Sequence, residues 1–142
     1  MLLLTAMPVQ FAYFLHDYFG EYQPRSAYWF DPIDFKDVAD GLLAGDARVK
    51  APAVYLSRDL DDGSARWLFY LHKQGRPDLW PRTREFDSAH VALNEVQPGS
   101  LLVLYANDPI VSTMLGPGRF VVEQSVIHAG GSPSALILRK AL

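Results

Sequence analysis

Four basic side chains and a tryptophan lie close together near the middle of the chain. This basic cluster consists of Lys73, Arg76, Trp80, Arg82 and Arg84. A guanidinium fork matches the oxygens of a phosphate, and a tryptophan can stack on a sugar or lie at a lipid headgroup. The cluster therefore predicts a site for a lipid phosphate or a sugar phosphate. The alternative is a solvated basic face that is balanced by acids elsewhere.

Other reactive residues form no recognisable motif. The sequence has no HExxH zinc motif, no P-loop and no G-x-S-x-G nucleophile elbow. The acids from Asp59 to Ser64 suggest a calcium loop, but the twelfth position counted from Asp59 is Tyr70 instead of glutamate. The histidines are scattered without metal-ligand spacing. We therefore expect no metal, no cofactor and no catalytic residue. The sequence does not exclude a catalytic triad whose members come together only in the folded protein.

A second place for a site lies at the ends of two predicted strands. Ligands of α/β folds bind outside the carboxyl ends of parallel strands. The segments that follow these strands are Ser57–Asp59 and Ala106–Asp108. They belong to an alternative interpretation, in which the chain is a free-standing small α/β enzyme or ligand-binding protein.

The composition is that of an ordinary globular protein. The 142 residues are 49% hydrophobic and 20% charged, which is enough for one domain with a core. The formal net charge of −3 argues against nucleic-acid binding driven by overall charge. The absence of cysteine excludes disulfides, zinc–thiolate sites and thiol catalysis.

The most unusual stretch is Pro8–Phe35, which contains ten of the eighteen aromatic residues. Read as a helix over Val9–Tyr22, it places a stripe of large apolar side chains on one face. The stripe consists of Phe11, Phe14, Leu15, Tyr18 and Tyr22. It is too apolar to face water, and its tyrosine hydroxyls suit the rim of a core or a bilayer interface. Contact with a membrane or with the body of a larger enzyme is expected for Phe11, Phe14, Tyr18 and Tyr22.

The segment before this stretch is also apolar. The first side chain that can be charged near neutral pH is His16, and the first basic residue is Arg25. Met1–Met7 is either a first strand or disordered cap, or the last turns of a membrane helix whose earlier part precedes this sequence. A stretch without lysine or arginine fits the outer side of a membrane.

A helix is expected after the aromatic stretch. Asp31 followed by Pro32 is typical of an N-cap and a first helical position, and Gly45 is typical of a C-cap. Between these signals, apolar residues recur at helical spacing. They are Phe35, Val38, Ala39, Leu42 and Leu43.

The remaining pattern predicts an α/β fold. Helices are expected over 65–74 and 110–115, although Arg66–His72 also alternates well enough for a strand. Strands are expected over Ala53–Leu56, Arg82–Phe86, Leu101–Tyr105, Phe120–Ile127 and Ala135–Arg139. The last two predict an antiparallel hairpin. Together these elements predict a small Rossmann-like sandwich with a mixed sheet, an N-terminal aromatic helix and a C-terminal β-hairpin.

Several short segments resemble one family of membrane enzymes. Trp67–Leu79 resembles a W-x-F-Y-x-x-x-x-G-R-x-D-L pattern, which Arg82-Thr83 and Pro98–Ser100 continue. This pattern is found in the soluble tails of bacterial glycosyltransferases related to the dolichyl-phosphate-mannose–protein mannosyltransferases. Other segments resemble the stretch that follows the last membrane helix of those enzymes: Gln10–Phe14, His16–Phe19, Tyr22, Arg25–Ala27 and Trp29–Phe30.

The resemblance implies a specific role. These enzymes combine a membrane body of many helices with an extracytoplasmic domain, and they move a sugar from a polyprenyl-phosphate carrier to an acceptor. Their acidic catalytic residues lie in the membrane body, so none can be assigned here. The chain is then expected to be a non-catalytic soluble domain on the periplasmic side of the cell membrane. Residues 1–30 would be its membrane-proximal aromatic segment, with Met1–Met7 ending the final membrane helix, and residues 31–142 its single α/β domain.

The expected partners follow from this role. They are the membrane body of the same enzyme or the bilayer surface, with a lipid-linked sugar phosphate or an acceptor as further candidates, and no nucleic acid. An interaction module that uses Phe11, Phe14 and Tyr18 as anchors is compatible with the same role.

Overall fold

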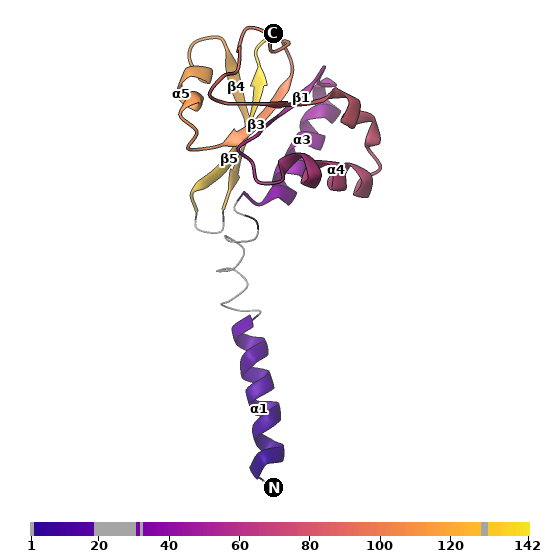
Figure 1. Cartoon of the computed structure of the whole chain (residues 1–142), viewed down its shortest axis with the longest axis vertical. Coiled ribbons are helices and arrows are strands. Elements are labelled where there is room, and N and C mark those ends of the chain that lie inside the picture. Colours follow the sequence, from indigo (N-terminus) through magenta and orange to yellow (C-terminus); the bar gives the residue numbers. More distant parts are fainter. Residues whose placement is uncertain (1, 19–30, 32, 129–130) are drawn as a thin grey trace. The chain divides into compact units, whose positions relative to one another are not determined.

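The computed structural model describes residues 2–18, residue 31, and residues 33–128 and 131–142. Contacts between residues divide the chain into two compact units, Met1–Pro32 and Ile33–Leu142. The first unit contains helix α1, and the second contains a sheet with its covering helices (Figure 1).

Within the described residues, the second unit has a five-stranded sheet with the order β2-β1-β3-β5-β4. Strand β1 pairs in parallel with β2 and with β3, whereas the β3–β5 and β5–β4 pairs are antiparallel. The strands are β1 (Val54–Ser57), β2 (Thr83–Phe86), β3 (Leu101–Tyr105), β4 (Phe120–Ile127) and β5 (Pro133–Lys140). The mixed sheet and its C-terminal hairpin confirm the predicted α/β class.

Both faces of the sheet are covered. Helices α3 (Phe35–Val49) and α4 (Gly63–Lys73) lie on one side, and the short helix α5 (Ile110–Met114) lies on the other (Figure 1). Because neighbouring residues of a strand point to opposite faces, Leu101 and Val103 join the core under α3 and α4, and Leu102 and Leu104 join the core on the α5 side. This explains why β3 is an unbroken apolar run.

Helix α3 begins later than the sequence suggests. Asp31 is not its N-cap, because Asp34 occupies that position with a left-handed φ of 49°. The Asp34 carbonyl accepts from the amides of Asp37 and Val38 at 2.8 and 3.3 Å. Ile33, the residue before this N-cap, is buried in the core, and aspartate tolerates the left-handed conformation better than most residues.

The sequence predicted Gly45 as the C-cap of α3, but the helix does not end there. The helix continues to Val49, and its C-cap is Lys50 at a left-handed φ of 47°. Gly45 lies instead against the sheet, where an added Cβ would be 3.0 Å from Leu101 Cδ1. The missing side chain thus favours the close approach of helix and sheet at this position.

Helix α4 confirms the helical interpretation of its segment and rules out the rival strand over Arg66–His72. Its residues Trp67 and Leu71 are four positions apart, so they share one face, and both are fully buried. Gly75, with a left-handed φ of 66°, follows the helix. A 3₁₀ helix, η2 (Pro77–Arg82), then leads directly into β2.

The first unit contains helix α1 (Leu2–Asp17), which starts well before the expected Val9 and includes Pro8. The segment Leu2–Met7 is therefore helical and not a strand. Tyr22, which was expected on the aromatic face, lies outside the described residues. In the part of the chain that the structure describes, no helix has both the length and the apolar composition needed to cross a bilayer.

A partly buried hydrogen bond connects α4 to the start of β2, and it gives a test of the packing there. Trp67 Nε1 donates to Thr83 Oγ1 at 3.0 Å, and Thr83 Oγ1 donates to the Leu79 carbonyl at 3.0 Å. The substitution Thr83→Val leaves a buried N–H without its acceptor, so it should lower the free energy of unfolding by about 1–3 kcal/mol in urea titrations. The control Thr83→Ser keeps the hydroxyl and should lose clearly less. Equal stability of the two variants would contradict this role of the hydroxyl.

Candidate functional site

Two arginines of the basic cluster converge on a buried carboxylate. Arg76 Nη2 donates to Asp46 Oδ2 at 2.8 Å, and Arg82 Nη1 donates to Asp46 Oδ1 at 3.2 Å and to the Ala51 carbonyl at 2.5 Å. The Asp46 side chain is only 3% exposed. Both of its oxygens have a cationic partner, which offsets the cost of burying the charge.

Asp46 was missed in the sequence analysis, although a signal was present. It comes four residues after Leu42 on the apolar face of α3, where an acid interrupts the helical repeat. A charged residue on a buried face needs a partner, so this position could have been flagged. The partners themselves lie 30 and 36 residues away along the chain, which no local pattern reveals.

A second acid, Asp78, holds the outer side of the same arginines. Arg76 donates from Nε to Asp78 Oδ1 at 2.9 Å and from Nη2 to Oδ2 at 3.1 Å, and Arg82 Nη2 is 3.4 Å from Oδ2. The hydrogen bond from Arg76 holds the pKa of Asp78 below its ordinary value, and hydrogen bonds to Asp78 and then Asp46 raise the pKa of Arg76. In contrast to Asp46, the Asp78 side chain is 54% exposed.

A hollow of about 490 Å³ opens beside this network. Its lining includes Asp46, Asp78 and both arginines, together with Lys50 from the end of α3. We call it the arginine hollow. Three basic residues and two acids thus meet at one surface depression, which gives it a small excess of positive charge.

The other three residues of the basic cluster do not line the arginine hollow. Lys73 Nζ lies 5.6 Å from the centroid of the Tyr70 ring. Arg84 Nη1 donates to the carbonyls of Pro81 and Thr83, each at 2.8 Å. Trp80 is exposed on η2. The structure therefore brings Arg76 and Arg82 together and directs the other three elsewhere.

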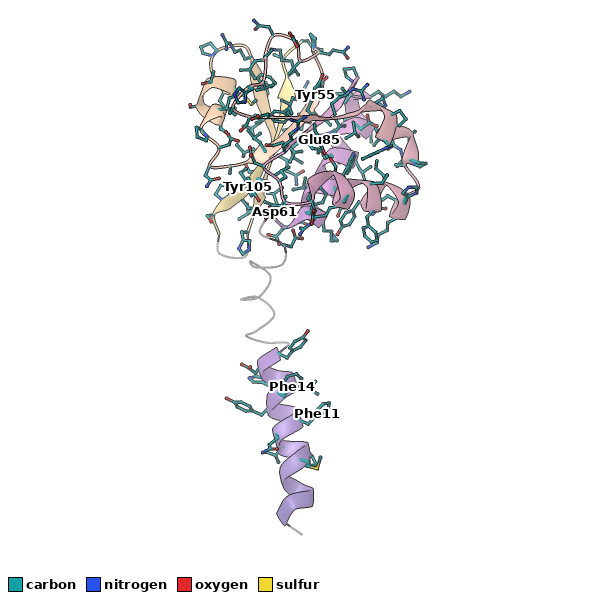
Figure 2. The ribbon with its side chains drawn as sticks, viewed as in Figure 1. Phe11, Phe14, Tyr55, Asp61, Glu85 and Tyr105 are labelled. Atoms are coloured by element: carbon teal, nitrogen blue, oxygen red, sulfur yellow. The ribbon has the colours of Figure 1, made fainter. Side chains whose placement is uncertain are left out.

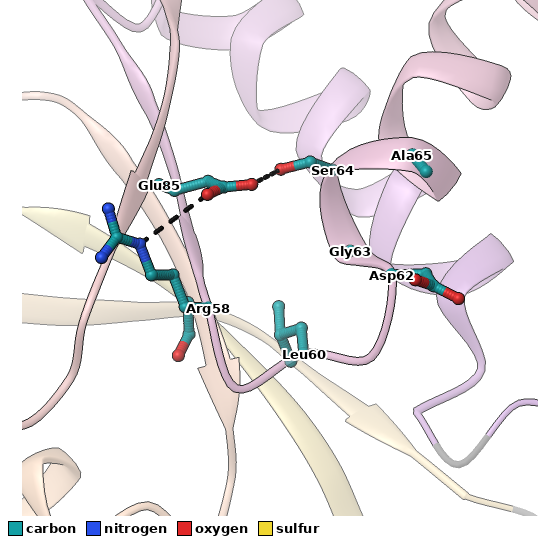
Figure 3. A pocket seen from close by; sticks show the side chains of 8 residues that line it. Arg58, Leu60, Asp62, Gly63, Ser64, Ala65 and Glu85 are labelled. Atoms are coloured by element: carbon teal, nitrogen blue, oxygen red, sulfur yellow. Dashed lines mark hydrogen bonds and ion pairs between the residues drawn. The ribbon is translucent and has the colours of Figure 1, made fainter.

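A second hollow, of about 430 Å³, lies at the carboxyl end of β1 (Figure 3). Ser57 and Arg58 line it, as do the first residues of α4 and Glu85 from β2. The Ser64 hydroxyl donates to Glu85, and Arg58 Nε lies 3.7 Å from the other oxygen of that carboxylate (Figure 3). The alternative interpretation predicts a ligand site at Ser57–Asp59, and Ser57 and Arg58 of that segment line this strand-end hollow.

In the described part of the chain, residues of the two segments of that alternative interpretation line different hollows. Asp108 lines a separate depression of about 360 Å³ together with Ser88, and its Oδ1 accepts from the Ile110 amide at 3.0 Å. Asp59 accepts from the hydroxyls of Ser57 and Ser88 at 3.2 and 2.9 Å. Over the described residues, no group of three His, Asp or Glu side chains is arranged to hold a metal ion.

The unequal burial of the two acids predicts unequal effects on stability. The substitution Asp46→Asn leaves two guanidinium groups without their buried partner and should lower the free energy of unfolding by about 1–3 kcal/mol. The matched control Asp78→Asn removes ion pairs from a carboxylate that is about half exposed to water, so its effect should be much smaller. Chemical denaturation of the two variants measures the difference. A larger loss for Asp78→Asn would contradict the assignment.

Neither a family model nor a curated protein nor a solved structure matches this chain. The function proposed below therefore rests on the residues and contacts of the chain and on the resemblance of its short segments.

Proposed function

We propose that the chain is a non-catalytic, extracytoplasmic domain of a membrane glycosyltransferase that takes its sugar from a polyprenyl-phosphate carrier. In this proposal, α1 contacts the bilayer surface, and the α/β unit helps to position the lipid carrier or the acceptor. The resemblance of Trp67–Leu79 and of the aromatic stretch to the tails of such enzymes supports the assignment. The observation that carries it is the exposed aromatic surface of α1.

This surface is a stripe at helical spacing. Met7, Phe11 and Phe14 recur every three or four residues on one side of α1, and Tyr18, the residue directly after the helix, continues this spacing. Phe11 is 62% exposed and Phe14 is 57% exposed, and both side chains project from α1 in Figure 2. The rings of Phe14 and Tyr18 stack with centroids 5.6 Å apart. Exposed aromatic area of this size is stabilised when it leaves water.

The chemistry of the stripe favours a bilayer interface as the partner. Tyr18 combines an apolar ring with a hydroxyl, which is the combination that membrane–water interfaces select. Aromatic side chains on one face of a helix can enter the headgroup region while the helix lies in the interface plane. The sequence contains no lysine or arginine before Arg25, which is typical of a segment on the outer side of a membrane.

The alternative, a small ligand-binding or enzymatic α/β protein, is favoured by one observation. The strand-end hollow lies outside the carboxyl ends of parallel strands, where such folds bind their ligands. Its acidic, basic and hydroxyl groups suit a polar ligand.

Vesicle binding tests the role of the aromatic stripe. We expect the full chain to sediment with vesicles of phosphatidylcholine and phosphatidylglycerol. Serine at Phe11, Phe14 and Tyr18 together should weaken this binding at least about tenfold, because each ring gives up apolar burial. The control variant has serine at Val9 and Tyr13, which lie on the opposite side of α1 and are also exposed. This variant should bind vesicles nearly as well as the unchanged chain. A chain that stays in the supernatant, or equal losses for both variants, would count against a stripe that lies on the bilayer.

A transfer assay tests the non-catalytic assignment. The purified 142-residue chain should neither transfer nor hydrolyse the sugar of a polyprenyl-phosphate donor above the rate of a protein-free blank, with or without a divalent cation. The assay follows release of a radiolabelled sugar. Turnover that scales with the chain's concentration would overturn the assignment and favour the enzymatic alternative.

A further inference from the structure

The arginine hollow contains guanidinium groups that are fixed from one side. Asp46 binds Arg76 at 2.8 Å and Arg82 at 3.2 Å, and the Ala51 carbonyl adds a contact to Arg82 at 2.5 Å. The Asp46 carboxylate is buried, so it cannot leave the arginines without an uncompensated charge in the interior. The two guanidinium groups are therefore held in place whatever binds their outer side.

Their outer side binds a carboxylate that is easy to replace. The Nε and Nη2 atoms of Arg76 contact the two oxygens of Asp78 at 2.9 and 3.1 Å, and Arg82 Nη2 adds a contact at 3.4 Å. A guanidinium fork binds two phosphate oxygens in this same geometry. The Asp78 side chain is about half exposed, and exposed ion pairs contribute little to stability. Its departure into water would cost the fold little.

A phosphate can form more contacts with these cations than the Asp78 carboxylate does. It offers three oxygens and up to two negative charges, whereas the carboxylate offers two oxygens and one charge. Lys50 lines the same hollow and supplies a third cation. The depression of about 490 Å³ leaves room for the group that bears the phosphate.

We propose that Arg76, Arg82 and Lys50 form a binding site for a phosphate monoester, and that Asp78 is a built-in competitor that the phosphate displaces. The identity of the bearer as a polyprenyl phosphate rests on the proposed function. The anion site itself rests only on the arrangement of Asp46, Asp78 and the three cations. Asp78 then sets the affinity of the site, because every bound phosphate must first replace it.

Titration with inorganic phosphate, followed by calorimetry or by the arginine Nε signals in NMR spectra, tests the anion site. Asp78→Asn removes the competing charge at nearly constant shape, so it should raise phosphate affinity by about tenfold or more. Asp40→Asn is the matched control, because Asp40 is another exposed acid, paired with Lys36 at 2.9 Å on the surface of α3. It removes the same charge elsewhere and should change the affinity less than about twofold.

A second pair of variants tests the arginines. In the Asp78→Asn background, Arg82→Gln should abolish phosphate binding, whereas Arg84→Gln should preserve it, because Arg84 is bound to the carbonyls of Pro81 and Thr83. Equal effects of Asp78→Asn and Asp40→Asn, or equal losses for the two arginine variants, would overturn the proposed site.

Vesicles separate the two sources of phosphate. Asp78→Asn should bind vesicles that contain a polyprenyl phosphate more tightly than phosphatidylglycerol vesicles of equal charge, and Arg82→Gln should remove the difference. Binding of inorganic phosphate without this preference would leave the anion site standing and overturn the polyprenyl phosphate as its ligand. If the chain shows neither binding of inorganic phosphate nor a preference for polyprenyl phosphate vesicles, the site is overturned. The aromatic stripe of α1 is tested separately by its own vesicle assay.

Discussion

The α/β unit depends on how one buried negative charge is neutralised. Asp46 lies on the core-facing side of α3, and its carboxylate is held by Arg76 and Arg82 from a segment that follows α4. These contacts fix η2 against the end of α3. Because β2 starts at the residue after Arg82, the same contacts connect the start of this edge strand to α3. One charge therefore connects a helix, a 3₁₀ turn and a strand that are distant in sequence.

The proposed functions divide between the two units. In α1, large apolar side chains are exposed at helical spacing, and the proposal assigns them to the bilayer surface. In the α/β unit, cations gather where a buried acid holds them and an exposed acid occupies them. In the proposal, the first surface contacts a bilayer and the second binds a phosphate, and neither role assigns a reaction to the chain.

Much of the fold followed from periodicity, and the failures have physical causes. The spacing of four between Trp67 and Leu71 predicted α4 correctly. The unbroken apolar run of β3 predicted a strand, and the structure shows this strand to be buried on both faces. Gly45 was misread because a glycine serves close packing as well as caps. The site was harder, since the basic cluster was defined by closeness in sequence. Arg76 and Arg82 lie at the two ends of η2 and both reach Asp46, whereas Arg84 lies in β2 and donates to backbone carbonyls. Their partner Asp46 precedes the two arginines by 30 and 36 residues.

The most direct test of this account is a double-mutant cycle between Asp46 and Arg82. Unfolding free energies of the Asp46→Asn, Arg82→Gln and combined variants give the coupling between the two side chains. If the buried carboxylate holds the arginine as described, the coupling should be about 1–3 kcal/mol, with the double variant losing much less than the two single losses together. Single losses that add within about 0.3 kcal/mol would show that the two groups do not depend on each other, and would contradict the account.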